Sequence, residues 1–516
     1  MKTFTVRAGV PRRLAAVIAV LGIAAAAWSA EVSASSVAAS PTTLDRAAID
    51  RYVQDYREQT GLPGAVVVVT QGTRVVHSVG YGHTATGRPV TAQTRIPVAS
   101  LSKSMTALAV MQLVEAGKVD LDEPVHRYLR EFTMADGRAE KITVRQLLTQ
   151  TSGMADSAYP DLARAQPHTL QEAVAEMREA RLANEPGSKN SYHNPNYFVA
   201  ARLVEVVSGQ PFADYLSAKI FRPLNMTHTT SVASTDEMPD HARGYVRAYG
   251  RVFAVSHPRW FTAGGHGVVT TADDLAQWLI AQNNGGVSAA GRRIAAARTV
   301  ALTHTPPRRP HDSTYAIGWR ESTSGKGPRE LQHTGQLLTH NAMATLLPES
   351  GIGIAVVTNT GMFSGDDARQ ISEGLVDLAQ GKDPEVVEPF SMAADRVLAI
   401  VTLLAIALGI RGVLRARRWV ERAVRHQWWR AALRMLPYTL PILFFAQLAF
   451  LFGRLMNRSG TLTQVAYAWP ALVICATAAA LASTALITAR GLAAFRLHRR
   501  ARSSDGHRQA RRSGCR

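Results

Sequence analysis

Ser100 and Lys103 stand three residues apart at the start of an apolar helical segment, 98–119. Residues at this spacing share one face of a helix, so we expect the Lys103 amine beside the Ser100 hydroxyl. A helix N-terminus also offers N–H donors and positive potential, which stabilise an anion. A desolvated lysine near other cations can accept a proton and so activate a serine nucleophile. Ser100 could equally be a helix N-cap, because Ser-x-x-Lys also arises by chance.

Two later groups of polar residues could join this pair. Tyr192 and Asn194 lie on a predicted loop ahead of a helix. A tyrosine near a lysine ammonium is biased toward phenolate, which suits proton relay. His333, Thr334 and Gly335 precede a late hairpin, where a strand edge offers backbone donors. Taken singly, these residues could also be a packing tyrosine, a turn-forming asparagine and a surface histidine.

The elements that must position these residues follow an α+β pattern. Hairpins are predicted at 64–82 and at 341–359, far apart in the chain. Helical periodicity is found between and beside them, at 45–59, 144–150, 170–181, 197–208, 272–282 and 366–380. Strands at both ends and helices between them predict an antiparallel sheet flanked by helices, completed by distant segments, with an inserted helical subdomain.

The flanks of this region carry membrane signals. Arginines, an apolar run and small residues predict a signal peptide over 1–34, followed by a flexible linker over 35–44. One domain is then expected over 45–385. Three further apolar stretches are predicted to be transmembrane helices, since a span needs roughly 20 apolar residues: 393–414, 435–455 and 465–489, with a basic tail over 490–516.

The formal charge of +19 is concentrated in these flanks. Residues 1–30 carry +4 and residues 395–516 carry +17, which leaves −2 for 31–394. The central region therefore lacks the positive charge that nucleic acid binding requires, and we expect no nucleic acid partner. Arginines gather in 415–434 and in the tail, so the positive-inside rule predicts a cytoplasmic tail and an extracytoplasmic domain at the cell membrane. The apolar stretches hold almost no ionisable groups, which favours anchoring in the lipid bilayer over transport.

Cysteine use and motif content argue against a bound metal. The two cysteines, Cys475 and Cys515, lie in an apolar stretch and in the tail, so the domain has no disulfide or thiolate site. The chain also lacks a His-Glu-x-x-His motif and a phosphate-binding glycine loop with lysine. We therefore expect no metal and no cofactor, and the sequence leaves the oligomeric state open.

In this order, the three motifs resemble those of the serine β-lactamase and penicillin-binding-protein superfamily. The resemblance is to its branch of class C β-lactamases, D-Ala-D-Ala carboxypeptidases and esterases. That family orders its motifs Ser-x-x-Lys, Tyr-x-Asn and Lys/His-Thr-Gly, matched here at 100–103, 192–194 and 333–335. The likeness covers about 45–382, implies a β-lactamase/transpeptidase-like fold and leaves the three C-terminal stretches unexplained.

The resemblance also implies roles for individual residues. Ser100 would form an acyl-enzyme, with Lys103 and Tyr192 sharing the proton. The backbone N–H groups of Ser100 and Gln336 would form the oxyanion hole. Asn194 would orient the acyl side chain. The remaining substrate-binding residues would be His333, Thr334 and Gly335.

Position 333 departs from the pattern of typical β-lactamases, which carry lysine there. A permanent charge is thereby replaced by a titratable one. The resemblance then implies a membrane-anchored extracytoplasmic serine hydrolase, acting on a D-amino-acid peptide, as a carboxypeptidase does, or on an ester. The substrate would be a small molecule or peptide, cell-wall-derived acyl compounds among them, and β-lactam hydrolysis is less favoured. A penicillin-binding sensor that acylates without turnover, and an acyltransferase or peptide cyclase, remain alternatives.

Overall fold

The structure is a computed structural model that describes residues 44–308, 313–322, 327–361, 366–423, 428–456 and 458–513. The predicted signal peptide, 1–34, and the predicted linker up to residue 43 lie outside the described residues. Below, the α+β domain means the described residues from Leu44 to Gly381, and the apolar-helix segment means those from Phe390 to Ser513.

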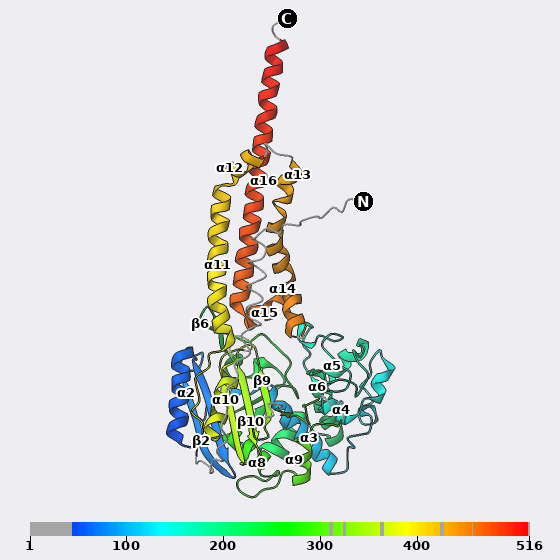
Figure 1. Cartoon of the computed structure of the whole chain (residues 1–516). Helices are drawn as coiled ribbons and strands as arrows, with labels where there is room; N and C mark the ends of the chain where they lie inside the picture. The colour runs from blue at the N-terminus through cyan, green and yellow to red at the C-terminus, as the bar shows by residue number, and fades with distance from the viewer. Residues whose placement is uncertain are drawn as a thin grey trace, which may run out of the picture. The chain divides into compact units, whose positions relative to one another are not determined.

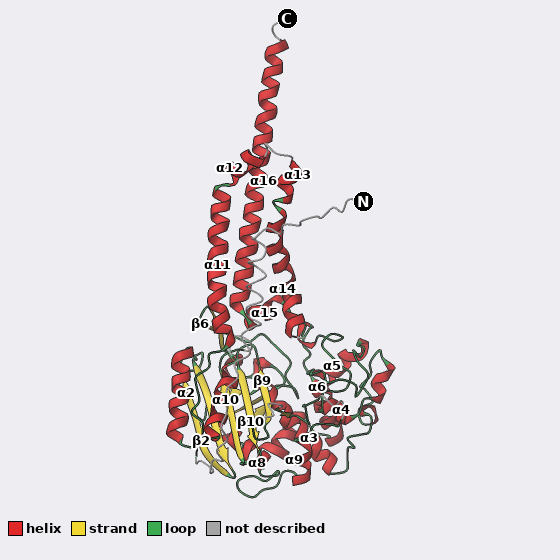
Figure 2. Cartoon of the chain, viewed as in Figure 1, coloured by secondary structure: helices red, strands yellow, loops and turns green. Residues whose placement is uncertain are grey.

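A six-stranded antiparallel sheet organises the α+β domain (Figures 1 and 2). Its order is β2 (Arg74–Gly82), β1 (Gly64–Gln71), β11 (Ile352–Thr358), β10 (Asn341–Leu347), β9 (Leu331–Gln336) and β8 (Arg320–Glu321). The two predicted hairpins meet in the middle of this sheet, where Val67 of β1 pairs with Val356 of β11. The predicted antiparallel sheet built from distant segments is therefore confirmed.

Both faces of the sheet are covered by helices, which explains why β1 is an unbroken apolar run. Helices α2 (Arg46–Thr60) and α10 (Asp367–Ala379) pack on one face, against Val67 and its neighbours. Helix α8 (Ala272–Asn283) packs on the other face, against Val66 and Val68. Successive side chains point to opposite faces of a strand, so a strand buried on both sides shows no polar alternation.

The chain between β2 and β8 forms the helical part of the domain and two small sheets. Its helices are α3 (Ser102–Glu115), α4 (Val144–Leu148), α5 (Leu170–Ala175), α6 (Pro195–Ser208), α7 (Phe212–Leu216), α8 and α9 (Ala297–Thr303). Its strands are β3 (Ile96–Pro97), β4 (Thr230–Ser231), β5 (Gly244–Ala248), β6 (Arg251–Val255) and β7 (Val268–Thr270). Helix α3 is buried on nearly every side, as an all-round apolar helix must be within a domain.

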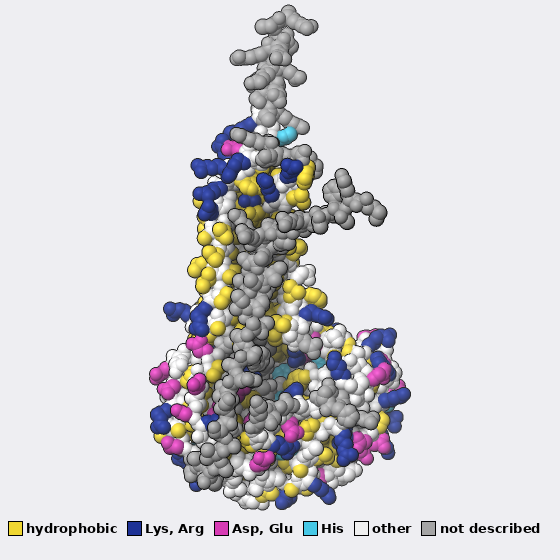
Figure 3. All heavy atoms as spheres, in the orientation of Figure 1, with side chains coloured by type: hydrophobic (Ala, Val, Ile, Leu, Met, Phe, Trp, Pro, Cys, Tyr) yellow, Lys and Arg dark blue, Asp and Glu magenta, His cyan; other side chains and the backbone are white. Residues whose placement is uncertain are grey.

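Six helices form the apolar-helix segment: α11 (Phe390–Leu414), α12 (Ala416–Ala423), α13 (Trp428–Leu433), α14 (Leu440–Met456), α15 (Leu462–Ala468) and α16 (Pro470–Ser513). Three stretches are long and apolar enough to cross a membrane: Phe390–Leu414, Trp429–Met456 and Pro470–Arg500. Their apolar side chains are largely uncovered, and Leu403 is 67% exposed. Figure 3 shows apolar side chains along α11 and basic side chains gathered beyond its C-terminal end. Such a surface is suited to lipid, as the sequence predicted.

The third apolar stretch differs in detail from its predicted extent, 465–489. The structure divides this stretch into α15 and α16 at Trp469. Pro470 has no N–H group and disfavours helical geometry in the residue before it, so a new helix starts there.

Candidate active site

Ser100 lies in a tight turn of 3-10 helix, Ala99–Leu101, between β3 and α3. The residue before it, Ala99, has φ of +50°, in the left-handed region that residues other than glycine rarely adopt. Ser102 holds this turn: its hydroxyl donates to the Ala99 carbonyl at 2.6 Å and accepts from the Val268 N–H at 2.9 Å. The turn therefore presents Ser100 at a fixed position.

Lys103 is fully buried, and its amine lies next to the Ser100 hydroxyl. Its Nζ is 3.0 Å from Ser100 Oγ, 3.0 Å from Asn194 Oδ1 and 2.8 Å from the Gly265 carbonyl oxygen. Burial, together with the charge of Arg458, holds the pKa of Lys103 well below its usual range, although Asp161 opposes this shift. A neutral amine can donate to the two carbonyl oxygens and turn its lone pair to the Ser100 hydroxyl.

Tyr192 packs against the same amine, with its ring centroid 5.0 Å from Lys103 Nζ. Burial raises the pKa of Tyr192 to about 12, although a hydrogen bond with Ser100 and the charge of Arg458 oppose the shift. The expected bias toward phenolate is therefore not found. The expectation assumed a lysine ammonium, whereas burial disfavours the charged forms of both side chains.

Asn194 links Lys103 to a buried carboxylate. It occupies the N-cap position of α6, where Pro195 is well suited to the first helical turn, yet its side chain makes no capping hydrogen bond. Its Oδ1 instead accepts from Lys103, and its Nδ2 donates to Asp161 Oδ2 at 2.9 Å. The amide is thereby held at both ends.

His333 and Thr334 lie on β9 and also line the pocket that Ser100 lines. His333 Nδ1 is 2.7 Å from the Thr334 carbonyl oxygen, which can only accept, so Nδ1 carries the proton. Its Nε2 then accepts from the Tyr315 hydroxyl at 3.0 Å. Burial and the nearby Lys103 lower the pKa of His333 to about 3. The residue that replaces the lysine of typical β-lactamases is therefore uncharged at neutral pH.

Gly335 explains how β9 approaches the turn that carries Ser100. A Cβ atom at Gly335 would lie 2.3 Å from the Val98 carbonyl oxygen, which no real side chain could tolerate. The absence of a side chain lets the two segments pass each other closely. Gln336, the next residue, reaches the same pocket as Ser100.

These residues surround a pocket of about 280 Å³. Of the predicted site residues, the pocket lining includes Ser100, Tyr192, Asn194, His333, Thr334 and Gln336, while Lys103 is buried next to Ser100 and Gly335 faces the Val98 carbonyl. The other lining residues were not predicted from the sequence: Leu162, Trp260, His266, Tyr315, Arg320, Gln332 and Arg458. None of these seven residues belongs to the three sequence motifs at 100–103, 192–194 and 333–335.

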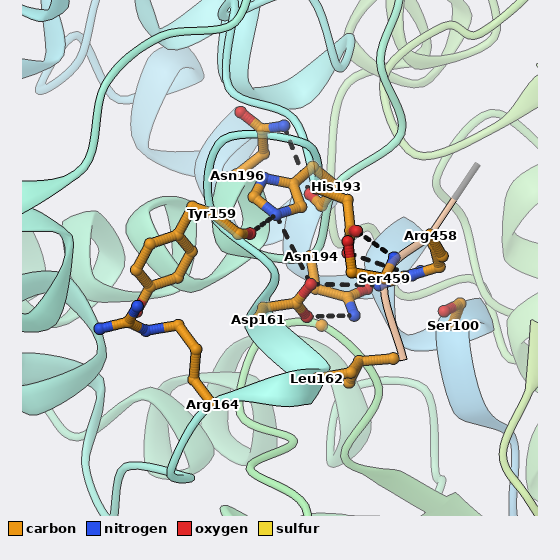
Figure 4. Close-up of polar contacts among 12 residues, drawn as sticks. Ser100, Tyr159, Asp161, Leu162, Arg164, His193, Asn194, Asn196, Arg458 and Ser459 are labelled. Carbon is orange, nitrogen blue, oxygen red and sulfur yellow. Dashed lines mark hydrogen bonds and ion pairs between the residues drawn. The ribbon is translucent and has the colours of Figure 1, made fainter. Parts of the chain in front are cut away.

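Asp161 and Arg458 form an ion pair at the edge of this pocket (Figure 4). Arg458 Nη2 donates to Asp161 Oδ1 at 3.3 Å, and the loop that carries Arg458 joins α14 to α15. Burial alone would raise the pKa of Asp161. The charge of Arg458 and the contacts with His193 and Asn194 outweigh it and hold this pKa well below its usual range.

Asp156, Asp161 and His193 are the described residues that could hold a metal ion, since their ligand atoms lie within 4.8 Å of one another. However, His193 Nε2 donates to the Tyr159 carbonyl at 2.8 Å, which removes this atom as a ligand. Both carboxylates also already have partners in the loop after α14, since Asp156 accepts from the Ser459 N–H and Asp161 from Arg458. The cluster therefore fits a guanidinium better than a metal.

Comparison with known proteins agrees with this geometry. Residues 49–375 match the family model described as Beta-lactamase. The curated relatives include Protein flp of Staphylococcus aureus, which is 26% identical over 60% of this chain. The chain spans 62% of the length of that protein. They also include Penicillin-binding protein 4 of Amycolatopsis lactamdurans, 28% identical over 64% of this chain and 90% of that protein.

Solved structures show the same fold. The octameric penicillin-binding protein homologue from Pyrococcus abyssi aligns with a TM-score of 0.56 and 25% identity, covering 69% of this chain and 81% of that one. EstCE1, a hydrolase with promiscuous acyltransferase activity, aligns with a TM-score of 0.54 and 22% identity, covering 64% and 98%. With its motifs in one pocket and most of its length matched by the family model, the chain belongs to the beta-lactamase family.

Proposed function

We propose that the chain is a membrane-anchored serine hydrolase that forms an acyl-enzyme on Ser100. The observation that carries the proposal is the 3.0 Å separation of Ser100 Oγ from Lys103 Nζ, in surroundings that hold the pKa of this amine well below its usual range. A neutral amine at hydrogen-bond distance is a general base in place for proton abstraction. The membership of the family supports the same chemistry.

The acylation step follows from this arrangement. Ser100 Oγ attacks the substrate carbonyl carbon while its proton passes to Lys103. The N–H groups of Ser100 and Gln336 stabilise the oxyanion that forms. When the intermediate collapses, the bond to the leaving oxygen or nitrogen breaks, and the proton returns to that atom through Lys103 and the protonated Tyr192. Water then hydrolyses the ester on Ser100.

The pocket favours an acyl compound whose leaving group carries a carboxylate. His333 is neutral, but Arg320 on the adjacent strand β8 also lines the pocket, opposite Gln332 of β9. Arg320 is exposed, and its guanidinium stacks on Tyr315, so its charge faces the pocket from one side. A guanidinium binds a carboxylate through two parallel hydrogen bonds. This supports a D-amino-acid peptide or a related ester. A β-lactam also carries a carboxylate, so its lower rank is based on His333 at the position of the family's lysine and not on Arg320.

The charge pattern supports an extracytoplasmic α+β domain. Arginines gather in and around α12 and at the C-terminal end of α16, whereas the loop between α14 and α15 carries few. By the positive-inside rule, the α12 region and the C-terminus lie in the cytoplasm. A reporter enzyme that works only in the cytoplasm should be active when it is fused to the C-terminus. A reporter that works only outside the cytoplasm should be inactive there. An extracytoplasmic signal would contradict this orientation.

The nucleophile is tested on the full-length protein in detergent. Ser100→Ala should abolish labelling by a fluorophosphonate probe and lower turnover of nitrophenyl esters and D-alanyl peptides by roughly a thousandfold or more. Ser104→Ala is the matched control, because this buried hydroxyl on the same helix only donates to the Leu101 carbonyl. Undiminished labelling of Ser100→Ala would refute the assignment.

The same assay separates the alternatives. A sensor would show one equivalent of acylation by a fluorescent penicillin and no turnover. An acyltransferase would give an amide or ester product when an amine or alcohol is supplied. Turnover with water as the acceptor supports the hydrolase.

A further inference from the structure

The loop between α14 and α15 belongs to the apolar-helix segment, yet it forms part of the wall of the active-site pocket. Arg458 of this loop lines the pocket together with Ser100 and Asn194. We propose that Arg458 is a positioning residue of the active site: it fixes Asp161, which holds Asn194, which in turn holds Lys103 against Ser100. The inference rests on the proposed function and adds that the apolar-helix segment takes part in catalysis as well as in anchoring.

An unbroken series of contacts connects Arg458 with the nucleophile. Arg458 Nη2 donates to Asp161 Oδ1 at 3.3 Å, and Asp161 Oδ2 accepts from Asn194 Nδ2 at 2.9 Å. Asn194 Oδ1 accepts from Lys103 Nζ at 3.0 Å, and Nζ lies 3.0 Å from Ser100 Oγ. Each group in the series except Arg458 is at least nine-tenths buried or lies in the pocket wall, so water competes little for these contacts.

Two contacts that follow Arg458 in the chain also hold this loop and the start of α15 against the α+β domain. The Ser459 N–H donates to the Asp156 carboxylate, and Gln464 Nε2 donates to the Leu162 carbonyl at 2.6 Å. Gln464 also forms a capping box with Thr461 that starts α15. The stretch 156–162 of the α+β domain is thereby clasped by the loop, and Asp161 lies within it.

Asp161 needs a cation because it shares its surroundings with a second acid. Asp156 and Asp161 are 6% and 7% exposed, and two buried carboxylates are costly without positive charge. His193 lies 3.5 Å from Asp161 Oδ1 but gives its Nε2 proton to Tyr159. Arg458 is the guanidinium that both acids face, at 3.3 Å from Asp161 and 3.9 Å from Asp156.

The charge of Arg458 also acts on Lys103. The titratable side chains that face Lys103 from the surrounding elements are Tyr192, Tyr197, His266 and His333, all of which burial keeps uncharged at neutral pH. In the described part of the chain, the charged groups that act on it are therefore Asp161, which raises its pKa, and Arg458, which lowers it. Removing Arg458 leaves Asp161 uncompensated, so the pKa of Lys103 rises. On the acid side of the pH profile of kcat/KM, the rate rises as Lys103 loses its proton. This acid limb should then move to higher pH.

The test uses the full-length protein in detergent and records kcat/KM for a nitrophenyl ester against pH. Rates are divided by the concentration of sites that a fluorophosphonate titrates, so that misfolded protein does not count. Arg458→Gln should move the acid limb up by about one pH unit, which lowers kcat/KM about fivefold at the wild-type midpoint and about tenfold well below it. Arg458→Lys keeps the charge and should leave the limb in place, with a smaller loss of rate. Arg454→Gln is the matched control, because this exposed arginine lies at the same end of α14.

Two results would overturn the inference. One is a wild-type acid limb in Arg458→Gln, and the other is an equal shift in Arg454→Gln. Failure of the proposed function would look different, since the wild-type protein would then not be labelled at Ser100. In that case, the pH dependence of Lys103 carbamylation by cyanate, followed by mass spectrometry, decides the inference. This reaction reports the neutral amine directly, and Arg458→Gln should shift it in the same direction.

Discussion

Two arginine–aspartate pairs lie in different regions of this molecule and illustrate different uses of one interaction. Arg247 of β5 and Asp367 of α10 are 1% and 0% exposed, and their closest approach is 3.2 Å. Arg458 and Asp161 approach to 3.3 Å, but Arg458 is 26% exposed. The first pair is enclosed within the α+β domain, whereas the second joins this domain to the apolar-helix segment.

The partners of each carboxylate show what it does. Asp367 accepts from the Tyr56 hydroxyl of α2 at 3.1 Å and from Thr360 at 2.6 Å, so it ties together elements of the sheet and its helices. Asp161 accepts from Asn194, which contacts the amine next to the nucleophile. A carboxylate among structural partners maintains the fold, while one bonded to an active-site amide can also influence chemistry.

The largest expected effect is the loss of stability when the enclosed pair is broken. Arg247→Gln leaves Asp367 buried without its cation, and breaking a buried pair costs about 3–5 kcal/mol of unfolding free energy. The same change at Arg458 should cost less, about 2 kcal/mol, because this side chain is partly exposed to water although the carboxylates it faces are buried. Thermal unfolding followed by tryptophan fluorescence measures the difference.

The two arginine–aspartate pairs should also differ in their effect on the pH dependence of kcat/KM. The active sites that remain folded in Arg247→Gln should show the wild-type acid limb, because Arg247 is not among the groups that act on Lys103. If Arg247→Gln shifted this limb, the division between a structural pair and a positioning pair would be wrong.

The sheet could be predicted from the sequence because its signals are local. The apolar run of β1 and the turn after it define one hairpin, and the apolar strands β10 and β11 define the other. The pairing of β1 with β11 was predictable because each hairpin has faces that must be buried. The break at Trp469 could also have been found, since Pro470 marks it.

The pocket was predictable only where short motifs mark it. Ser100, Tyr192 and His333 belong to patterns that a reader can recognise, but Asp161 and Arg458 are 297 positions apart and belong to none. In a sequence, an arginine near the end of an apolar helix is interpreted as a marker of membrane topology and not as part of an active site. The protonation of Tyr192 was predicted incorrectly for a related reason: it depends on burial, which spacing does not reveal.

The smallest expected effect concerns a second contact between the α+β domain and the apolar-helix segment. The Tyr249 hydroxyl lies 2.9 Å from Thr402 Oγ1 of α11 and donates to the Ala471 carbonyl of α16 at 3.1 Å. Tyr249→Phe removes both contacts and should cost about 0.5–1.5 kcal/mol. The main-chain N–H of Tyr249 still donates to Asp395 Oδ2 at 2.7 Å, so the two regions should stay together.

Because Tyr249 is not among the groups that act on Lys103, Tyr249→Phe should lower the melting temperature slightly and leave the acid limb of kcat/KM in place. Comparing it with Arg458→Gln separates two explanations for any dependence of the rate on the apolar-helix segment. If only Arg458→Gln moves the limb, the specific contact with Asp161 is responsible. If both variants move it equally, the site responds to docking of the segment as a whole, and Arg458 has no special part in it.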